Sequence, residues 1–258
     1  MKSRLVHLFV AILLLVTALP ASGQGKFYTR KMRLADFPTK TTKIVLEGNS
    51  FLELTLREEI TVHWRISPFE FCDQDEFNRL RNSSDYYFLS LIQEEGLAYL
   101  ILEKGGKEGE KDQLKQAFEV IRMPMASVDA PSGRELVFMG AFLDIIQHFV
   151  EQAILSDKVA YGGLEASNDT RLKGKTVYLD PDAADEAYLE EKADALLGIT
   201  IAPEEISFKT VCYKMLISAD THELLYYEKN RYKGPADGQF TDAEARRFSR
   251  RGATVVRD

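Results

Sequence analysis

Histidine and cysteine are the residues of this chain best suited to metal binding or nucleophilic chemistry, and the chain has only four of the first and two of the second. Beyond the N-terminal segment the histidines are His63, His148 and His222, and no two of them stand at the short spacing of a metal-binding motif. Neither Cys72 nor Cys212 belongs to a C-x-x-C motif. We therefore expect no metal site, although a Cys–His pair assembled in space stays open as an alternative.

The motifs of common enzymes are also missing from the sequence. It contains no G-x-S-x-G nucleophile elbow and no H-E-x-x-H zinc motif. The glycine-rich segment 104–112 includes Gly-Gly-Lys but lacks the spacing of a phosphate-binding loop, so a flexible loop is favoured there. The sequence predicts no catalytic residue and no cofactor.

The densest acidic cluster lies at 180–186. A calcium site would need alternating oxygen donors and a glycine at the turn, whereas a proline and two alanines stand between these acids. We instead expect Asp182 to cap a helix, and Asp185 and Glu186 to interact favourably with its N-terminal dipole.

Two sets of side chains are candidates for a partner surface. Tyr87, Tyr99 and Tyr227 fall on predicted hairpins, where alternate side chains face away from the core, although packing under helices is the alternative explanation. Near the C-terminus, four arginines surround Phe248. They suit either a solvated terminal helix or a segment that docks on an acidic surface or a lipid phosphate. These arginines are Arg246, Arg247, Arg250 and Arg251.

The N-terminal segment predicts export. Lys2 and Arg4 precede an apolar run from Leu8 to Leu19, and small residues follow it, which is the pattern of a signal peptide spanning 1–23. No later segment reaches the length of a membrane span. In an exported protein Cys72 and Cys212 can form a disulfide, and two separate buried thiols are the other arrangement that the sequence allows.

Composition limits the remaining classes of function. The chain has 258 residues, 45% of them hydrophobic, and a formal charge of -7, values that are ordinary for a globular protein. An acidic balance argues against nucleic-acid binding, which needs a basic surface.

The elements that must position these residues follow a repeated order. After an irregular leader at 24–43, strands are predicted at 44–46 and 64–71, helices begin at Ser50 and Asp73, and a hairpin covers 86–104. A strand at 118–126 then precedes a long helix, in which Phe138 to Ala153 form a broad apolar stripe.

The second half repeats this order. It predicts a strand at 176–179, a helix at 182–197, a strand at 199–202 and a hairpin at 209–229. We expect an α+β fold with two βαβ-plus-hairpin lobes, at 44–160 and 161–232, mixed sheets and an Arg-rich tail at 233–258. An ancient duplication would produce this order, and so would chance.

Segment 44–103 resembles the N-terminal α/β module of TolB-type and CsgG-type cell-envelope proteins in its order of elements. The resemblance rests on the strand at Ile44, the helix from Ser50, the strand at Trp64, the helix start at Cys72-Asp73 and the strand at Tyr86. The whole chain also resembles exported proteins of Bacteroidetes-like Gram-negative bacteria. Both resemblances imply a periplasmic protein that works through contacts with other envelope components.

Two functions are therefore expected. The first is a non-enzymatic, exported interaction or accessory protein of the cell envelope, with envelope proteins as partners. The alternative is a periplasmic protein that binds or hydrolyses glycan or peptidoglycan fragments in a cleft between the lobes. A deep cleft with convergent polar groups favours the second function, and flat exposed strands favour the first.

Overall fold

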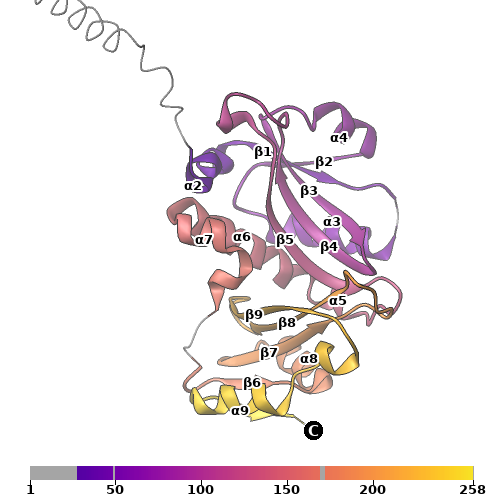
Figure 1. Ribbon diagram of the computed structural model, residues 1–258, viewed down its shortest axis with the longest axis vertical. Coiled ribbons are helices and arrows are strands. Elements are labelled where there is room, and N and C mark those ends of the chain that lie inside the picture. The colour runs from indigo at the N-terminus through magenta and orange to yellow at the C-terminus, as the bar shows by residue number, and fades with distance from the viewer. Residues whose placement is uncertain (1–27, 49, 169–171, 258) are drawn as a thin grey trace, which may run out of the picture.

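The computed structural model describes residues 28–48, 50–168 and 172–257 (Figure 1). It contains two five-stranded mixed sheets with helices around them, which confirms the α+β fold expected from the sequence. The predicted signal peptide at 1–23 lies outside the described residues. Among the described helices, none combines the length and the apolar character that crossing a membrane requires.

The first sheet has the strand order β2-β1-β3-β4-β5. Strand β1 pairs in parallel with β2 and β3, and β3, β4 and β5 form an antiparallel meander. Its strands are β1 (Thr41–Val45), β2 (Phe69–Cys72), β3 (Tyr86–Glu94), β4 (Leu97–Lys104) and β5 (Phe118–Ser127).

The second sheet has the order β10-β6-β7-β8-β9 and the same pairing, with two parallel contacts followed by two antiparallel ones. Its strands are β6 (Thr176–Tyr178), β7 (Ala195–Ile201), β8 (Val211–Ser218), β9 (Leu224–Arg231) and β10 (Thr254–Val256). The predicted repeat is therefore present in space as two sheets of equal pattern.

Helices cover these sheets and join them. They are α2 (Arg30–Leu34), α3 (Phe51–His63), α4 (Gln74–Leu80), α5 (Arg134–Val137), α6 (Met139–Leu155), α7 (Asp157–Gly162), α8 (Pro181–Leu189) and α9 (Asp242–Arg250). Short 3-10 helices lie at η1 (Phe37–Thr39), η2 (Gln113–Lys115), η3 (Gly163–Ser167) and η4 (Pro235–Gly238).

The long helix α6 lies at the centre of the main core. The apolar stripe predicted from Phe138 to Ala153 is buried at every one of its positions. One continuous hydrophobic cluster includes Phe142 of α6, Met123 of β5, Ile199 of β7 and Met215 of β8. Because this cluster takes residues from both sheets, the two lobes share a core and pack as one unit.

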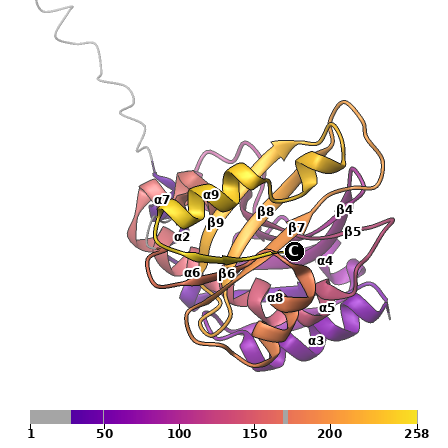
Figure 2. The same ribbon diagram turned by 90° about the horizontal axis from the view of Figure 1, so that it is seen from below.

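The leader and the tail are both more ordered than the sequence suggested. In the described part of the leader, Thr29 caps α2, and Leu34 and Phe37 are fully buried. The tail supplies α9, which lies across the second sheet (Figure 2), and β10, which pairs with β6. The described part of this tail, 233–257, therefore belongs to the second lobe, because Phe248 fills a cluster against that sheet.

The helix predicted at 182–197 is shorter than expected. Asp180, and not Asp182, accepts the capping hydrogen bond, from the Ala183 N–H, and α8 ends at Leu189. Glu191 and Asp194 then adopt positive φ values of 46° and 61°, which turn the chain directly into β7 at Ala195.

Candidate metal centre

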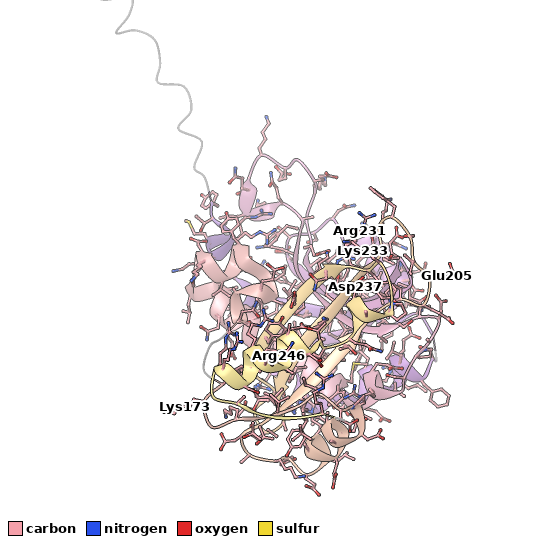
Figure 3. The ribbon with its side chains drawn as sticks, turned by 60° about the horizontal axis from the view of Figure 1, so that its bottom comes forward. Lys173, Glu205, Arg231, Lys233, Asp237 and Arg246 are labelled. Carbon is pink, nitrogen blue, oxygen red and sulfur yellow. The ribbon has the colours of Figure 1, made fainter. Side chains whose placement is uncertain are left out.

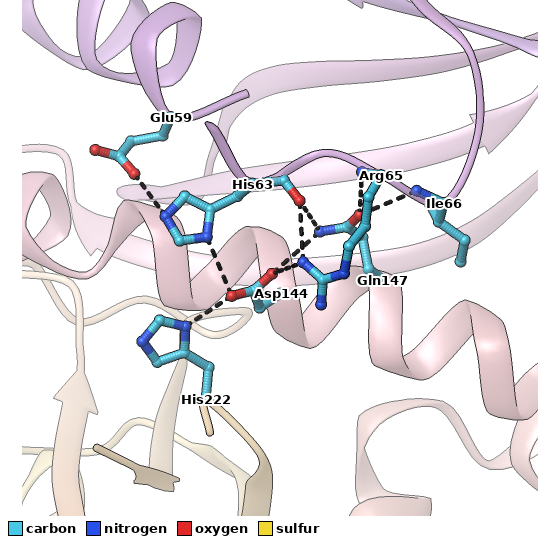
Figure 4. A network of polar contacts seen from close by, with 7 residues as sticks. All are labelled: Glu59, His63, Arg65, Ile66, Asp144, Gln147 and His222. Atoms are coloured by element: carbon cyan, nitrogen blue, oxygen red, sulfur yellow. Dashed lines mark hydrogen bonds and ion pairs between the residues drawn. The ribbon is translucent and has the colours of Figure 1, made fainter. Parts of the chain in front are cut away.

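Three polar side chains from distant parts of the chain converge at the junction of the lobes (Figure 4). They are His63 at the end of α3, Asp144 on α6 and His222 in the turn between β8 and β9. One ligating atom from each lies within 4.8 Å of the other two. We call this group, with the residues that hold it, the junction site.

Helix α3 delivers His63 because of how it starts and what it buries. The capping box of Ser50 and Glu53 fixes its first turn, and Leu56 and Ile60 are buried on one face. His63 is its last residue and comes very close to α6 at Gly140. A Cβ atom at that position would lie 2.7 Å from His63 Nε2, so a glycine is needed for this approach.

The β8–β9 hairpin delivers His222 from the second lobe. The His222 N–H donates to the carbonyl oxygen of Ser218 at 3.1 Å, and His222 has a φ of 55°. This left-handed conformation is uncommon for a residue with a side chain. It turns the imidazole toward Asp144, whose Oδ2 lies 2.7 Å from His222 Nδ1.

The two carboxylate oxygens of Asp144 have separate partners. Oδ1 accepts hydrogen bonds from Arg65 NH1 at 2.7 Å and from Gln147 Nε2 at 3.2 Å. Oδ2 faces His63 Nδ1 at 3.1 Å and His222 Nδ1 at 2.7 Å. Arg65 and Gln147 thus hold the carboxylate so that one oxygen is directed at both imidazoles.

Gln147 is fully buried and ties this arrangement to the backbone of the first lobe. Its Oε1 accepts from the N–H groups of Arg65 and Ile66, and its Nε2 also donates to the His63 carbonyl. The segment that follows α3 is therefore fixed against α6, which limits the freedom of both His63 and Arg65.

His63 has a carboxylate at each ring nitrogen. Nε2 lies 3.2 Å from Glu59 Oε2, and Nδ1 lies 3.1 Å from Asp144 Oδ2. A neutral imidazole has only one N–H, so one of its nitrogens would direct a lone pair at an oxygen. The site is satisfied either by a doubly protonated His63 or by a cation between His63 Nδ1 and Asp144.

Charge at the junction site keeps Asp144 ionised. Burial alone would raise the pKa of this carboxyl, but the hydrogen bonds from His222, Arg65 and His63 hold its pKa well below the usual range. With neutral histidines, Glu59 and Asp144 carry two negative charges against one positive charge on Arg65. A cation is therefore favoured electrostatically.

The sequence did not single out this site, because its spacing along the chain is long. Asp144 is 81 residues from His63 and 78 from His222. The third histidine, His148, is half-buried on α6 and lies outside this group. The sequence carried no separate signal for Asp144, because α6 has four other polar residues: Gln147, His148, Glu151 and Gln152.

The prediction that three tyrosines form an exposed partner surface is wrong. Tyr87, Tyr99 and Tyr227 are all buried. The Tyr87 hydroxyl donates to Asp36 at 2.6 Å, and the Tyr99 hydroxyl lies 3.4 Å from that of Tyr213 at the contact between the lobes. Packing between elements accounts for these rings.

The four arginines lie on or next to α9 and do not form a free tail. Arg246 is exposed on α9 (Figure 3), and so is Arg250. Arg247 is exposed as well, but it donates to the Tyr226 hydroxyl at 2.5 Å, and Arg251 follows the helix and is half-buried. Only part of this set is therefore available to a partner.

The disulfide between Cys72 and Cys212 is not formed. Both thiols are free and buried, Cys72 in the first sheet and Cys212 in the second. Burial raises the pKa of Cys72 to about 11 and also raises the pKa of Cys212. Thiols of this kind are poor nucleophiles, so a catalytic Cys–His pair has no support from these two residues.

The acidic cluster at 180–186 is explained by the local structure. Asp180 caps α8, and Asp185 accepts from Arg134 Nε at 2.8 Å. These contacts leave no reason to assign a cation there.

Comparison with known proteins identifies no relative of this chain: no protein-family model matches it, and neither does any curated protein or solved structure. The resemblance to envelope modules therefore stays a prediction, and the junction site must be judged on its own geometry.

Proposed function

We propose that the protein binds a divalent transition-metal ion of the zinc class at the junction site. The ligands are Nδ1 of His63, Oδ2 of Asp144 and Nδ1 of His222. The observation that carries the proposal is that these three atoms converge while the other polar atoms of His63 and Asp144 already have partners.

The distances suit such an ion after small movements. Zinc bonds of about 2.0–2.2 Å in a tetrahedral site separate neighbouring ligand atoms by about 3.3 Å. Here Asp144 Oδ2 lies 3.1 Å from one Nδ1 and 2.7 Å from the other. Two imidazole ligands favour zinc, nickel, copper or iron over magnesium and calcium, which take oxygen ligands.

The outer contacts are also those of a metal site. Ligating histidines usually donate their second N–H to a carboxylate, and ligating carboxylates are themselves hydrogen-bonded. Glu59 fills the first role for His63, and Arg65 with Gln147 fills the second for Asp144. Three protein ligands leave a fourth position for water or another ligand.

The ion would join the two lobes, because its ligands come from α3 and α6 of the first lobe and from a hairpin of the second. A metal that joins two lobes suits a non-enzymatic accessory protein of the cell envelope, which is the function expected from the sequence. Export and envelope partners are part of this proposal. A metal bound only by the folded protein also stabilises it in proportion to the logarithm of its concentration.

Zinc binding tests the proposal directly. We expect the purified protein to bind one Zn²⁺ in competition with a chromophoric chelator, and His222→Ala and His63→Ala to lose at least about tenfold in affinity. His148→Ala is the matched control, since His148 lies one helical turn beyond Asp144 and outside the group. Binding of one Zn²⁺ that survives both ligand variants would contradict the proposal.

Gly140→Ala gives a second test that keeps all three ligands. The added methyl group would meet His63 Nε2 and Glu59 Oε2 and displace them. We expect zinc affinity to fall about tenfold, as for loss of an outer partner, while the Co²⁺-loaded protein shows an altered visible spectrum. An unchanged affinity would show that His63 does not ligate from this position.

A further inference from the structure

A cavity of about 290 Å³ lies where the parallel strands of the second sheet end. Leu179 and Asp180 follow β6, Arg257 follows β10, and Thr200 lies near the end of β7. In open sheets, ligands commonly bind outside the carboxyl ends of parallel strands. The volume of this cavity is close to the lower limit of small-molecule sites, which is about 300 Å³.

The first lobe also contributes to this cavity, through Arg134 of α5. Figures 1 and 2 both show α5 next to α8, and Arg134 Nε donates to Asp185 of α8 at 2.8 Å. The cavity therefore lies between the lobes, as the alternative function expected from the sequence requires. Its lining includes no residue of the junction site, so binding here does not depend on the proposed metal.

Phe240 and Leu179 form an apolar wall of the cavity. A Cβ atom on Gly198 would lie 3.1 Å from Phe240 Cε2 and 2.9 Å from the Tyr178 carbonyl oxygen, so a glycine allows the ring to approach β7 this closely. The Phe240 ring also packs against Phe248, with 6.1 Å between the ring centroids. These contacts hold Phe240 in place as one side of the cavity.

Three side chains of the lining have hydrogen-bond donors that are not in use. Within the described part of the chain, the Arg134 side chain donates only through Nε, to Asp185, and its Nη2 is buried without a partner. The Thr200 hydroxyl and the Gln239 side-chain amide also have no hydrogen bond to any described residue. Because a buried donor without a partner costs free energy, the cavity favours a molecule that brings acceptors.

The charges of the lining do not favour an ion. Arg134 pairs with Asp185 at 2.8 Å, and Arg257 pairs with Asp242 at 2.6 Å. Asp180 also lines the cavity, and one of its carboxylate oxygens caps α8. An anion would meet the Asp180 carboxylate and a cation would meet the two guanidinium groups, so a neutral molecule is preferred.

We infer that this cavity binds a neutral sugar ring, because sugar hydroxyl groups both donate and accept hydrogen bonds. The hydroxyl oxygens accept from Arg134, Thr200 and Gln239. The hydroxyl hydrogens donate to the Asp180 carboxylate, and the C–H groups of the ring pack against Phe240. An apolar wall with a few convergent polar groups is the usual form of a small-molecule site.

Three sugars with a similar ring test the class of ligand. Near pH 6, N-acetylglucosamine is neutral, glucosamine is a cation and glucuronate is an anion. We expect titrations followed by protein NMR to show the tightest binding for N-acetylglucosamine, by at least about fivefold over each charged sugar. Equal or tighter binding of a charged sugar, or no binding of N-acetylglucosamine, overturns the inference.

Paired variants test the location of the site. Thr200→Val/Gln239→Ala removes two of the unused donors, and we expect it to weaken N-acetylglucosamine binding at least about tenfold. Thr254→Val/Gln93→Ala is the matched control, since both residues are exposed on strands and lie outside the lining. This control should bind like the native protein. Unchanged affinity in the first pair, or an equal loss in both pairs, overturns the assignment of the sugar to this cavity.

Discussion

The two sheets have one strand pattern but complete it from different parts of the chain. In the first, the outer parallel strand β2 lies between β1 and β3 in the sequence, whereas in the second the equivalent strand β10 comes from the last residues described. A position in the sheet is therefore not tied to a position in the sequence. The C-terminal segment, which by composition resembles a tail, is structurally necessary to the second lobe.

Each sheet also has a buried lysine on the middle strand of its three antiparallel strands. Lys104 of β4 reaches Asp36, and Lys214 of β8 reaches Glu244 on α9. The acids differ in their access to water, since the Asp36 side chain is 36% exposed and that of Glu244 is 11% exposed. The second lobe therefore depends more on its ion pair and on the helix that carries it.

Deletion of 241–258 should have the largest effect on the stability of the second lobe. It removes β10 and the fully buried Phe248, and loss of a buried phenylalanine side chain alone costs about 3–5 kcal/mol. We expect no cooperative unfolding transition for the second lobe in thermal denaturation. The double variant Arg246→Ala/Arg250→Ala, which removes exposed charge only, should stay within about 0.5 kcal/mol of the native protein. A deletion variant with native stability would restore the interpretation of a free tail.

Isosteric substitution of the two acids gives the next largest effect. We expect Glu244→Gln to cost about 3 kcal/mol, because it leaves the Lys214 charge buried without a counter-charge. Asp36→Asn should cost about 1 kcal/mol, because Asp36 is near water and the Lys104 ammonium keeps its bond to the Arg33 carbonyl. Chemical denaturation of both variants measures the difference, and equal costs would show that the two pairs are equivalent.

Much of each lobe could be predicted because its signals are local. The helix start at Ser50 and the apolar stripe of α6 were both predicted from the sequence and are present. The pairing of β10 with β6 was not, since a three-residue strand carries no mark of its partner.

The junction site could not be predicted for a similar reason. Its residues become neighbours only when α3 and the β8–β9 turn both approach α6, and the close approach of α3 requires the glycine at Gly140. Burial likewise decided the outcome for the tyrosines, because alternation along a strand does not show that both faces are covered.

Acid should reduce the difference in unfolding free energy between the Glu244→Gln variant and the native protein. Burial raises the pKa of the Glu244 carboxyl, but the hydrogen bonds from the Thr241 N–H and Lys214 lower this pKa by more than burial raises it. The pKa of Glu244 is therefore below its ordinary value. Such a group stabilises the fold above the unfolded pKa of about 4.3, and this contribution is lost as pH falls through the folded pKa. We expect the full difference in unfolding free energy at pH 6 and a shrinking one below about pH 4. A difference that grows in acid would contradict the lowered pKa.

The smallest effect concerns the contact between the sheets themselves. Tyr99 and Tyr213 each occupy the third residue of their strand, and their hydroxyls lie 3.4 Å apart. Tyr99→Phe and Tyr213→Phe should each cost at most about 1 kcal/mol, the value of one hydrogen bond. If the hydroxyls serve mainly each other, the double variant should cost no more than either single one, since removing both leaves no unpaired partner. Additive costs in the double-mutant cycle would instead mean that each hydroxyl acts within its own sheet. The two strands would then be equivalent in their backbone pairing but not in the contacts of these side chains.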